Sequence, residues 1–142
     1  MSLAAIAFDQ SPVAMVMTDR DLRIVRTSAR WLKEMAITTG VLGLDLDSVF
    51  PGWTGRRRAE FDACLRGETP APIERPFNLP NGETPWIRVT LGPWRRPDRS
   101  VGGVLIHVED ITRDVEARER IERSEQRLKI AADIAKLLVY EM

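Results

Sequence analysis

In the first half of the chain, short apolar runs alternate with polar or Gly/Pro-containing turns. An apolar run that stops at the polar turn Asp19-Arg20-Asp21 and resumes after it is typical of a β-hairpin. Ser28 follows the hairpin and is a favoured N-cap residue for a helix. The elements predicted here are a helix over 3–9, strands over 13–18 and 22–27, a helix over 29–35, irregular turns or single helical turns over 38–50, and a helix over 56–65.

The pattern of the second half is typical of β-strands up to residue 110. The segment Pro80-Asn81-Gly82-Glu83 predicts a hairpin, because Asn and Gly tolerate positive φ. Strands are expected over 73–79, 84–93 and 101–110. Two strands, two helices and three strands in this order predict an α+β fold, with a five-stranded antiparallel sheet and helices on one face.

Beyond residue 111 the pattern becomes helical and highly charged. Residues 111–131 contain no Gly or Pro, and acidic side chains repeatedly precede basic ones by four positions, which supports a helix. Small and apolar residues recur at alternating spacings of three and four, which indicates a short and weak heptad seam suited to dimerisation. We call these positions the seam: Ala117, Ile121, Ser124, Leu128, Ala131, Ala135 and Leu138.

The last residues return to an apolar run. Residues 133–139 resemble residues 9–15, since in both a predicted helix enters an apolar strand. We therefore expect residues 137–142 to be a strand that begins a second copy of the same domain.

Composition excludes several classes of protein. The chain has 142 residues, and its 21 basic and 21 acidic side chains cancel, which argues against a nucleic-acid partner. One Cys and one His are too few for a disulfide or a structural zinc site, so no metal is expected. No apolar run is long enough to span a bilayer. We expect a cytoplasmic segment without membrane contact, although a longer protein carrying it could be membrane-anchored.

Several of these segments together resemble a bacterial PAS domain. The opening S-P-V-A-M-V-M-T-D-R-D is similar to the first PAS hairpin, and N-G-E-T-P-W-I-R-V is similar to the long strands. The run G-G-V-L-I-H-V-E-D-I-T-R-D resembles the last strand and the Asp-Ile-Thr signature that joins PAS cores to an output helix. The resemblance covers residues 8–120. It implies a PAS core with its flanking helix over 3–112 and a helical signalling linker over 113–136.

The resemblance also implies a function and its residues. PAS domains are sensory or dimerisation modules of histidine kinases, cyclic-dinucleotide enzymes and transcription regulators, so a homodimer and a small-molecule ligand are expected. Signal coupling is expected at Asp110, Ile111 and Thr112, with Arg88 or Arg113 as the donor to Asp110. The residues expected to line a ligand cavity between sheet and helices are Val16, Val25, Trp31, Leu32, Phe61 and Ile106.

No residue cluster indicates catalysis, and we expect no enzyme activity. His107 lies on a predicted strand, whereas haem-binding relatives carry their His on a helix. Haem is therefore not expected. Cys64 lacks the motif around the reactive Cys of flavin-binding relatives, so flavin is not expected either, and we expect Cys64 to pack in the core. Residues Arg56-Arg57-Arg58 are interpreted as a solvated helix start in preference to an anion patch.

Two alternatives remain beside the sensor. A ligand-free PAS domain that only dimerises or docks partner proteins would have a core filled by bulky side chains. An enzyme with a cone-shaped α+β fold would need polar residues that converge inside the cavity.

Overall fold

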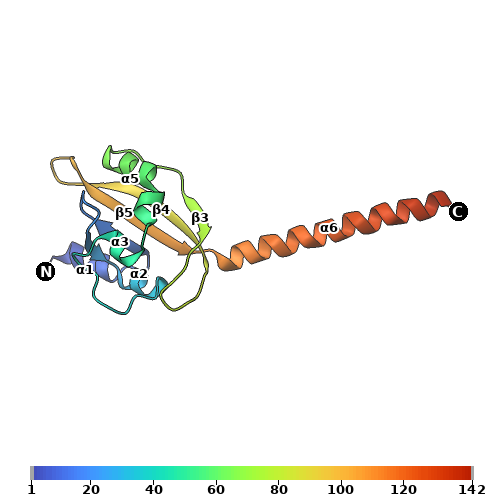
Figure 1. The fold of residues 1–142 in the computed structure, drawn as a ribbon, viewed down its shortest axis with the longest axis horizontal. Coiled ribbons are helices and arrows are strands. Elements are labelled where there is room, and N and C mark those ends of the chain that lie inside the picture. Colours follow the sequence, from blue (N-terminus) through green and yellow to red (C-terminus); the bar gives the residue numbers. More distant parts are fainter. Residues whose placement is uncertain (1, 142) are drawn as a thin grey trace. The chain divides into compact units, whose positions relative to one another are not determined.

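The computed structural model of the chain describes residues 2–141, which form two compact units divided between Asp110 and Ile111. Figure 1 shows the elements along the chain. They are α1 (Leu3–Asp9), β1 (Ala14–Thr18), β2 (Ile24–Thr27), α2 (Ala29–Glu34), α3 (Leu46–Val49), α4 (Trp53–Arg56), α5 (Arg58–Leu65), β3 (Ile73–Pro76), β4 (Trp86–Arg95), β5 (Val101–Asp110) and α6 (Thr112–Glu141).

The first unit contains one five-stranded sheet with the strand order β2-β1-β5-β4-β3. Every neighbouring pair is antiparallel, and the central strand β5 pairs with both β1 and β4. This confirms the predicted fold class and strand sequence. The helix expected over 56–65 is α5, which begins at Arg58. A separate short helix, α4, precedes it, and the stretch over 38–50 contains the single turn α3.

Helices α2 to α5 pack on one face of this sheet (Figure 1). Strand alternation places Val16, Val89 and Ile106 toward the helices, and all three are buried. The helices supply Trp31 from α2 and Phe61 from α5 to the same core. The core that surrounds the candidate site is therefore built from one face of the sheet and one side of each helix.

The side chain of Ser28 joins β1 to α2. Its hydroxyl accepts hydrogen bonds from the amides of Met15 (3.0 Å) and Trp31 (3.2 Å), and it donates to the carbonyl of Val13 (2.8 Å). Ser28 is the N-cap of α2, as its position in the sequence predicts. This cap also orients α2 so that Trp31 enters the core.

The two long strands end in a tightly packed region around Trp94. The Trp94 indole donates a hydrogen bond to the carbonyl of Thr18 at 2.6 Å. A Cβ added at Gly102 would lie 2.2 Å from the Trp94 ring, and one added at Gly103 would lie 1.9 Å from the Thr18 carbonyl oxygen. Both glycines are therefore required for the close approach of β1, β4 and β5.

The predicted Asn-Gly hairpin joins β3 to β4. Gly82 has a φ of +87°, and its amide donates to the carbonyl of Leu79 at 3.0 Å. Strand β3 ends at Pro76, earlier than the predicted residue 79. Phe77 and Leu79 still donate to the carbonyls of Pro85 and Glu83, but without the regular ladder of a strand.

The second unit consists of α6, a helix of 30 residues in which no described residue is buried. The strand expected over 137–142 is wrong for residues 137–141, which continue α6, and Met142 lies outside the described residues. No Gly or Pro interrupts the helix, and an apolar run forms a strand only beside another strand. That a second domain copy begins here stays a prediction.

Candidate functional site

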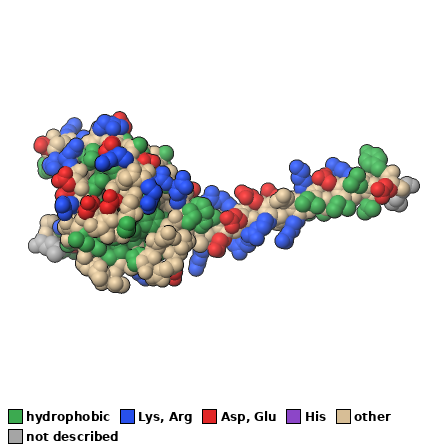
Figure 2. All heavy atoms as spheres, in the orientation of Figure 1, with side chains coloured by type: hydrophobic (Ala, Val, Ile, Leu, Met, Phe, Trp, Pro, Cys, Tyr) green, Lys and Arg blue, Asp and Glu red, His purple; other side chains and the backbone are tan. Residues whose placement is uncertain are grey.

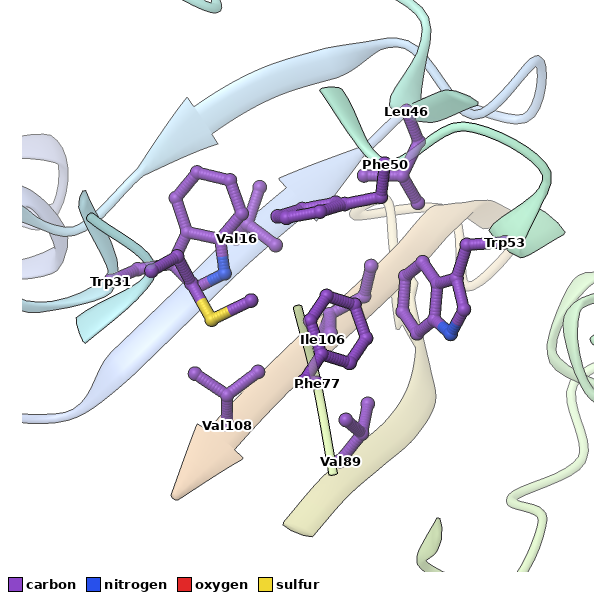
Figure 3. Close-up of a pocket in the computed structure, with 10 residues that line it drawn as sticks. Val16, Trp31, Leu46, Phe50, Trp53, Phe77, Val89, Ile106 and Val108 are labelled. Atoms are coloured by element: carbon purple, nitrogen blue, oxygen red, sulfur yellow. The ribbon is translucent and has the colours of Figure 1, made fainter. Parts of the chain in front are cut away.

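The space between the sheet and the helices is almost completely filled. A cavity of ≈ 10 Å³ remains, which is about the space that one water molecule needs. Figure 3 shows the side chains around it, and all of them are apolar. They are Val16, Trp31, Met35, Leu46, Phe50, Trp53, Phe77, Val89, Ile106 and Val108.

Aromatic rings occupy most of this space (Figure 3). Phe50 makes edge-to-face contacts with Trp31, Trp53 and Phe77, at centroid distances of 6.1, 6.1 and 5.2 Å. Trp53 contacts Phe77 at 5.9 Å and Phe61 at 5.3 Å. Each such contact stabilises the packing by about 0.5–1.5 kcal/mol beyond burial alone. The cluster therefore resists opening for a ligand.

Only some of the residues that were expected to line the cavity do so in the structure. Val16, Trp31 and Ile106 surround it, whereas Phe61 is buried against Trp53. Leu32 is half-buried against the core. Val25 was a wrong choice, because it is 42% exposed.

The error at Val25 follows from strand alternation. The neighbouring Ile24 is completely buried, so the next side chain on β2 points to the other face of the sheet. The sequence pattern of a short strand does not reveal which of its two faces is covered.

Sequence reasoning missed the aromatic residues between α2 and β4. Phe50 lies after a single helical turn, and Phe77 follows the last residue of β3. Neither belongs to a regular element, so periodicity could not place them. The signal available in the sequence was that Phe50, Trp53 and Phe77 are bulky aromatic residues that stand directly beside Pro or Gly.

The size and lining of the cavity limit what the core can do. Pockets for metabolite-sized ligands have volumes of roughly 300–1,000 Å³ and contain a few polar groups. Here the volume is ≈ 10 Å³ and the lining is apolar. The enzyme alternative would require converging polar residues, and none lines this cavity.

The predicted coupling residues lie where the two units join along the chain. Strand β5 ends at Asp110, and α6 begins at Thr112. Ile111 between them is 3% exposed, whereas Arg113 is exposed. The roles expected of these four residues stay predictions.

Arg88 forms ion pairs with two glutamates. Its guanidinium donates to Glu109 at 3.0 Å and to Glu74 at 3.2 Å, on the strands either side of β4. These three side chains are partly exposed, so solvent screens both ion pairs and their contribution to stability is small. Arg88 therefore connects β3, β4 and β5 on the outer face of the sheet.

Cys64 and His107 occupy positions that suit packing. Cys64 is completely buried, and burial raises the pKa of its thiol to about 11, which keeps it protonated and unreactive at neutral pH. His107 is half-buried on β5, opposite Met15 and Thr90 on the adjacent strands. Within residues 2–141, no group of His, Cys, Asp or Glu side chains could hold a metal ion.

The described helices were also compared with the requirements of a membrane span. None of them combines the necessary length with sufficient apolar character.

Comparison with known families gives one assignment for most of the chain. The family described as the PAS fold matches residues 8–116. No significant match was found among curated proteins.

Several solved structures have the same fold. An RNA-binding light-oxygen-voltage receptor superposes with a TM-score of 0.70 at 18% identity, over 89% of this chain and 37% of the receptor. The VqmA dimer of Vibrio cholerae gives 0.67 at 15% identity, over 80% and 53%. The PAS domain of Bordetella pertussis BvgS gives 0.62 at 18% identity, over 87% and 95%. This chain thus spans about a third to a half of the first two proteins, and at these identities the likeness concerns the fold.

Proposed function

Because this chain belongs to the PAS fold family, we propose that it is a sensory module that responds at its surface and relays the response through α6 in a homodimer. PAS domains serve in signal transduction, and the proposal adds where the signal enters and leaves. A longer protein carrying this module would be a histidine kinase or a cyclic-dinucleotide enzyme. The module itself would perform no catalysis.

One observation carries the proposal, namely the uncovered apolar side of α6. Within the seam, Ile121 is 58% exposed, Leu128 is 69% exposed and Leu138 is 57% exposed. Figure 2 shows charged side chains along α6 and apolar ones gathered toward its C-terminal half. A second copy of the seam would cover these residues in a parallel coiled coil, with the charged side chains left in water.

The filled core supports a response to an event at the surface rather than to a ligand bound in the interior. A ligand in the cavity would have to displace the ring cluster around Phe50, which now leaves ≈ 10 Å³. A change at a surface or an interface needs no such expansion. It can shift a two-state equilibrium through its differential affinity for the two states.

The relay is proposed to pass through Asp110, Ile111 and Thr112. This segment is the direct covalent connection between the last strand and α6. Asp110 is exposed, so a charge-assisted contact of its carboxylate contributes about 1 kcal/mol or less, which still shifts a two-state helix whose two states are close in free energy.

The experiment that tests the proposal measures self-association of the chain and of two matched variants. Wild-type protein is expected to sediment as a dimer at micromolar concentration, and Leu128→Glu to shift it to monomer, because a glutamate in the seam places like charges together. Ile130 is the control site, since it is 52% exposed on the same helix but lies outside the seam. Ile130→Glu should leave the dimer intact.

Two results would contradict this arrangement. A wild-type monomer at all accessible concentrations would remove the dimeric relay. A dimer that Ile130→Glu dissociates and Leu128→Glu does not would show that α6 associates through another side.

The filled core also favours a second candidate, a PAS domain that only docks partners and relays no signal. The two candidates differ in whether α6 responds to a change at the end of β5. If α6 protection in hydrogen exchange does not respond to Asp110→Ala, the docking function is the better description.

A further inference from the structure

A hollow of ≈ 500 Å³ lies on the surface of the first unit, outside the filled core. One wall comes from the end of α3 and from α4, and the other from the segment between β3 and the hairpin turn. Its volume falls in the range of small-molecule sites, roughly 300–1,000 Å³. The lining residues are Val49, Phe50, Pro51, Arg56, Pro76, Phe77, Asn78, Leu79 and Pro80.

The polar groups of the hollow are donors. Among the described residues, the guanidinium of Arg56 has no hydrogen bond or close ion pair, although its charge lowers the pKa of Asp47. The Oδ1 of Asn78 accepts from the hydroxyl of Thr84 at 3.2 Å, so its amide NH₂ is left as a donor. None of the nine lining residues is acidic. The hollow therefore favours an anion over a cation.

The guanidinium of Arg56 lies beside the N-cap residue of its own helix, Gly52. A Cβ added at Gly52 would lie 2.8 Å from a terminal guanidinium nitrogen of Arg56, so the guanidinium lies close over this glycine. The planar guanidinium presents a fork that matches a carboxylate. Arg56, which sequence analysis assigned to a solvated helix start, is exposed and lines the hollow.

The remaining lining is apolar and partly aromatic. The half-buried ring of Phe77 lies edge-to-face with Phe50 at 5.2 Å and with Trp53 at 5.9 Å, which leaves one part of it at the hollow. Pro51, Pro76 and Pro80 have no backbone N–H that would need water. An aromatic ring laid against Phe77 would bury apolar surface without leaving polar groups unsatisfied.

From these groups we infer that the hollow is a binding site for a small aryl carboxylate, with its carboxylate on Arg56 and its ring against Phe77. Phe50 and Phe77 line both the hollow and the inner cavity, so an occupant would contact the cluster that fills the core. This would be the surface event of the proposed function. Binding itself does not depend on α6 or on dimerisation, so the two proposals fail separately.

The test is a titration of the ¹⁵N-labelled chain with sodium benzoate, followed by NMR and by calorimetry. A dissociation constant on the order of 1 mM is expected for so small a ligand. The largest amide shifts should fall in 49–56 and 77–79. Benzamide, a neutral molecule of the same shape, should bind at least about tenfold more weakly, because it cannot form the charge-assisted contact.

A pair of variants isolates the arginine. Arg56→Gln should weaken benzoate binding about tenfold or more. Arg58→Gln is the matched control, because both arginines lower the pKa of Asp47 but only Arg56 lines the hollow. Arg58→Gln should bind as the wild type does.

Three results would overturn the inference. The first is that benzoate does not bind at a concentration of about ten times the expected dissociation constant. The second is that the amide shifts are centred away from the hollow. The third is that Arg56→Gln and the wild type bind benzoate with equal affinity.

Discussion

At the scale of single residues, Gly103 shows how little space the sheet leaves. A Cβ at this position would meet a backbone oxygen, that of Thr18, at 1.9 Å, and a backbone cannot move aside as a flexible side chain can. We expect Gly103→Ala to lower the free energy of unfolding by about 3 kcal/mol or more. Urea denaturation followed by tryptophan fluorescence measures the change.

Gly92 offers a matched control in the same sheet. No atom lies within 4 Å of a Cβ added there. Gly92→Ala should therefore change the stability by no more than about 1 kcal/mol. Equal losses in the two alanine variants would show that the contact with Thr18 is not the cause.

Asp47 makes stability dependent on pH. The Thr54 hydroxyl donates to its carboxylate at 2.5 Å and the Thr54 amide at 3.0 Å. These hydrogen bonds lower the pKa of Asp47, with smaller contributions from Arg56 and Arg58. Because the folded state holds the carboxylate ionised, the stabilisation is complete above the unfolded pKa of about 4 and is lost as pH falls below it.

Denaturation at several pH values checks this expectation. The wild type should lose stability between about pH 4 and pH 2 more steeply than Asp47→Asn, which has no proton to bind there. Parallel curves for the two proteins would show that Asp47 does not contribute to the acid sensitivity.

At the scale of elements, α6 is a long helix without a buried face. A helix of 30 residues in which no described residue is buried is only partly stable in water. We therefore expect its helicity to depend on association through the seam. On dilution below the dimer dissociation constant, ellipticity at 222 nm should fall while the near-ultraviolet signal of the core tryptophans stays constant.

Leu128→Glu supplies the control for dilution. It should show the reduced ellipticity at every concentration. A wild-type signal that is independent of concentration down to the monomer would mean that α6 is stable alone.

At the scale of the whole molecule, the question is whether the sheet and α6 respond together. Asp110→Ala is expected to raise amide exchange over 112–116 by about twofold to fivefold, because loss of an exposed charge-assisted contact shifts local opening by about that amount. Exchange within β1 and β4 should not change. Glu109→Ala is the matched control, since its carboxylate binds Arg88 on the outer face of the sheet.

Unchanged exchange over 112–116 in Asp110→Ala would remove Asp110 from the coupling. Equal increases in the two variants would indicate that the loss of either negative charge at the end of β5 raises exchange, without a specific role for Asp110.

The sequence by itself determined the elements whose signals are local. Ser28 as an N-cap, the Asn81-Gly82 turn and the charged helix after Thr112 all depend on interactions between near neighbours, and all three are present. The resemblance to PAS domains in the last strand correctly predicted the family. The resemblance also implied the five-stranded antiparallel sheet, whereas the strand order β2-β1-β5-β4-β3 came from the structure.

Tertiary structure alone decided which side chains meet. The face of β2 that is covered excluded Val25 from the core, and the irregular segments around Phe50 and Phe77 brought their rings to the same cavity. Arg56 and Asn78 lie far apart in the sequence yet line one hollow. Burial depends on what the rest of the chain places opposite a residue, and neither periodicity nor local propensity contains that information.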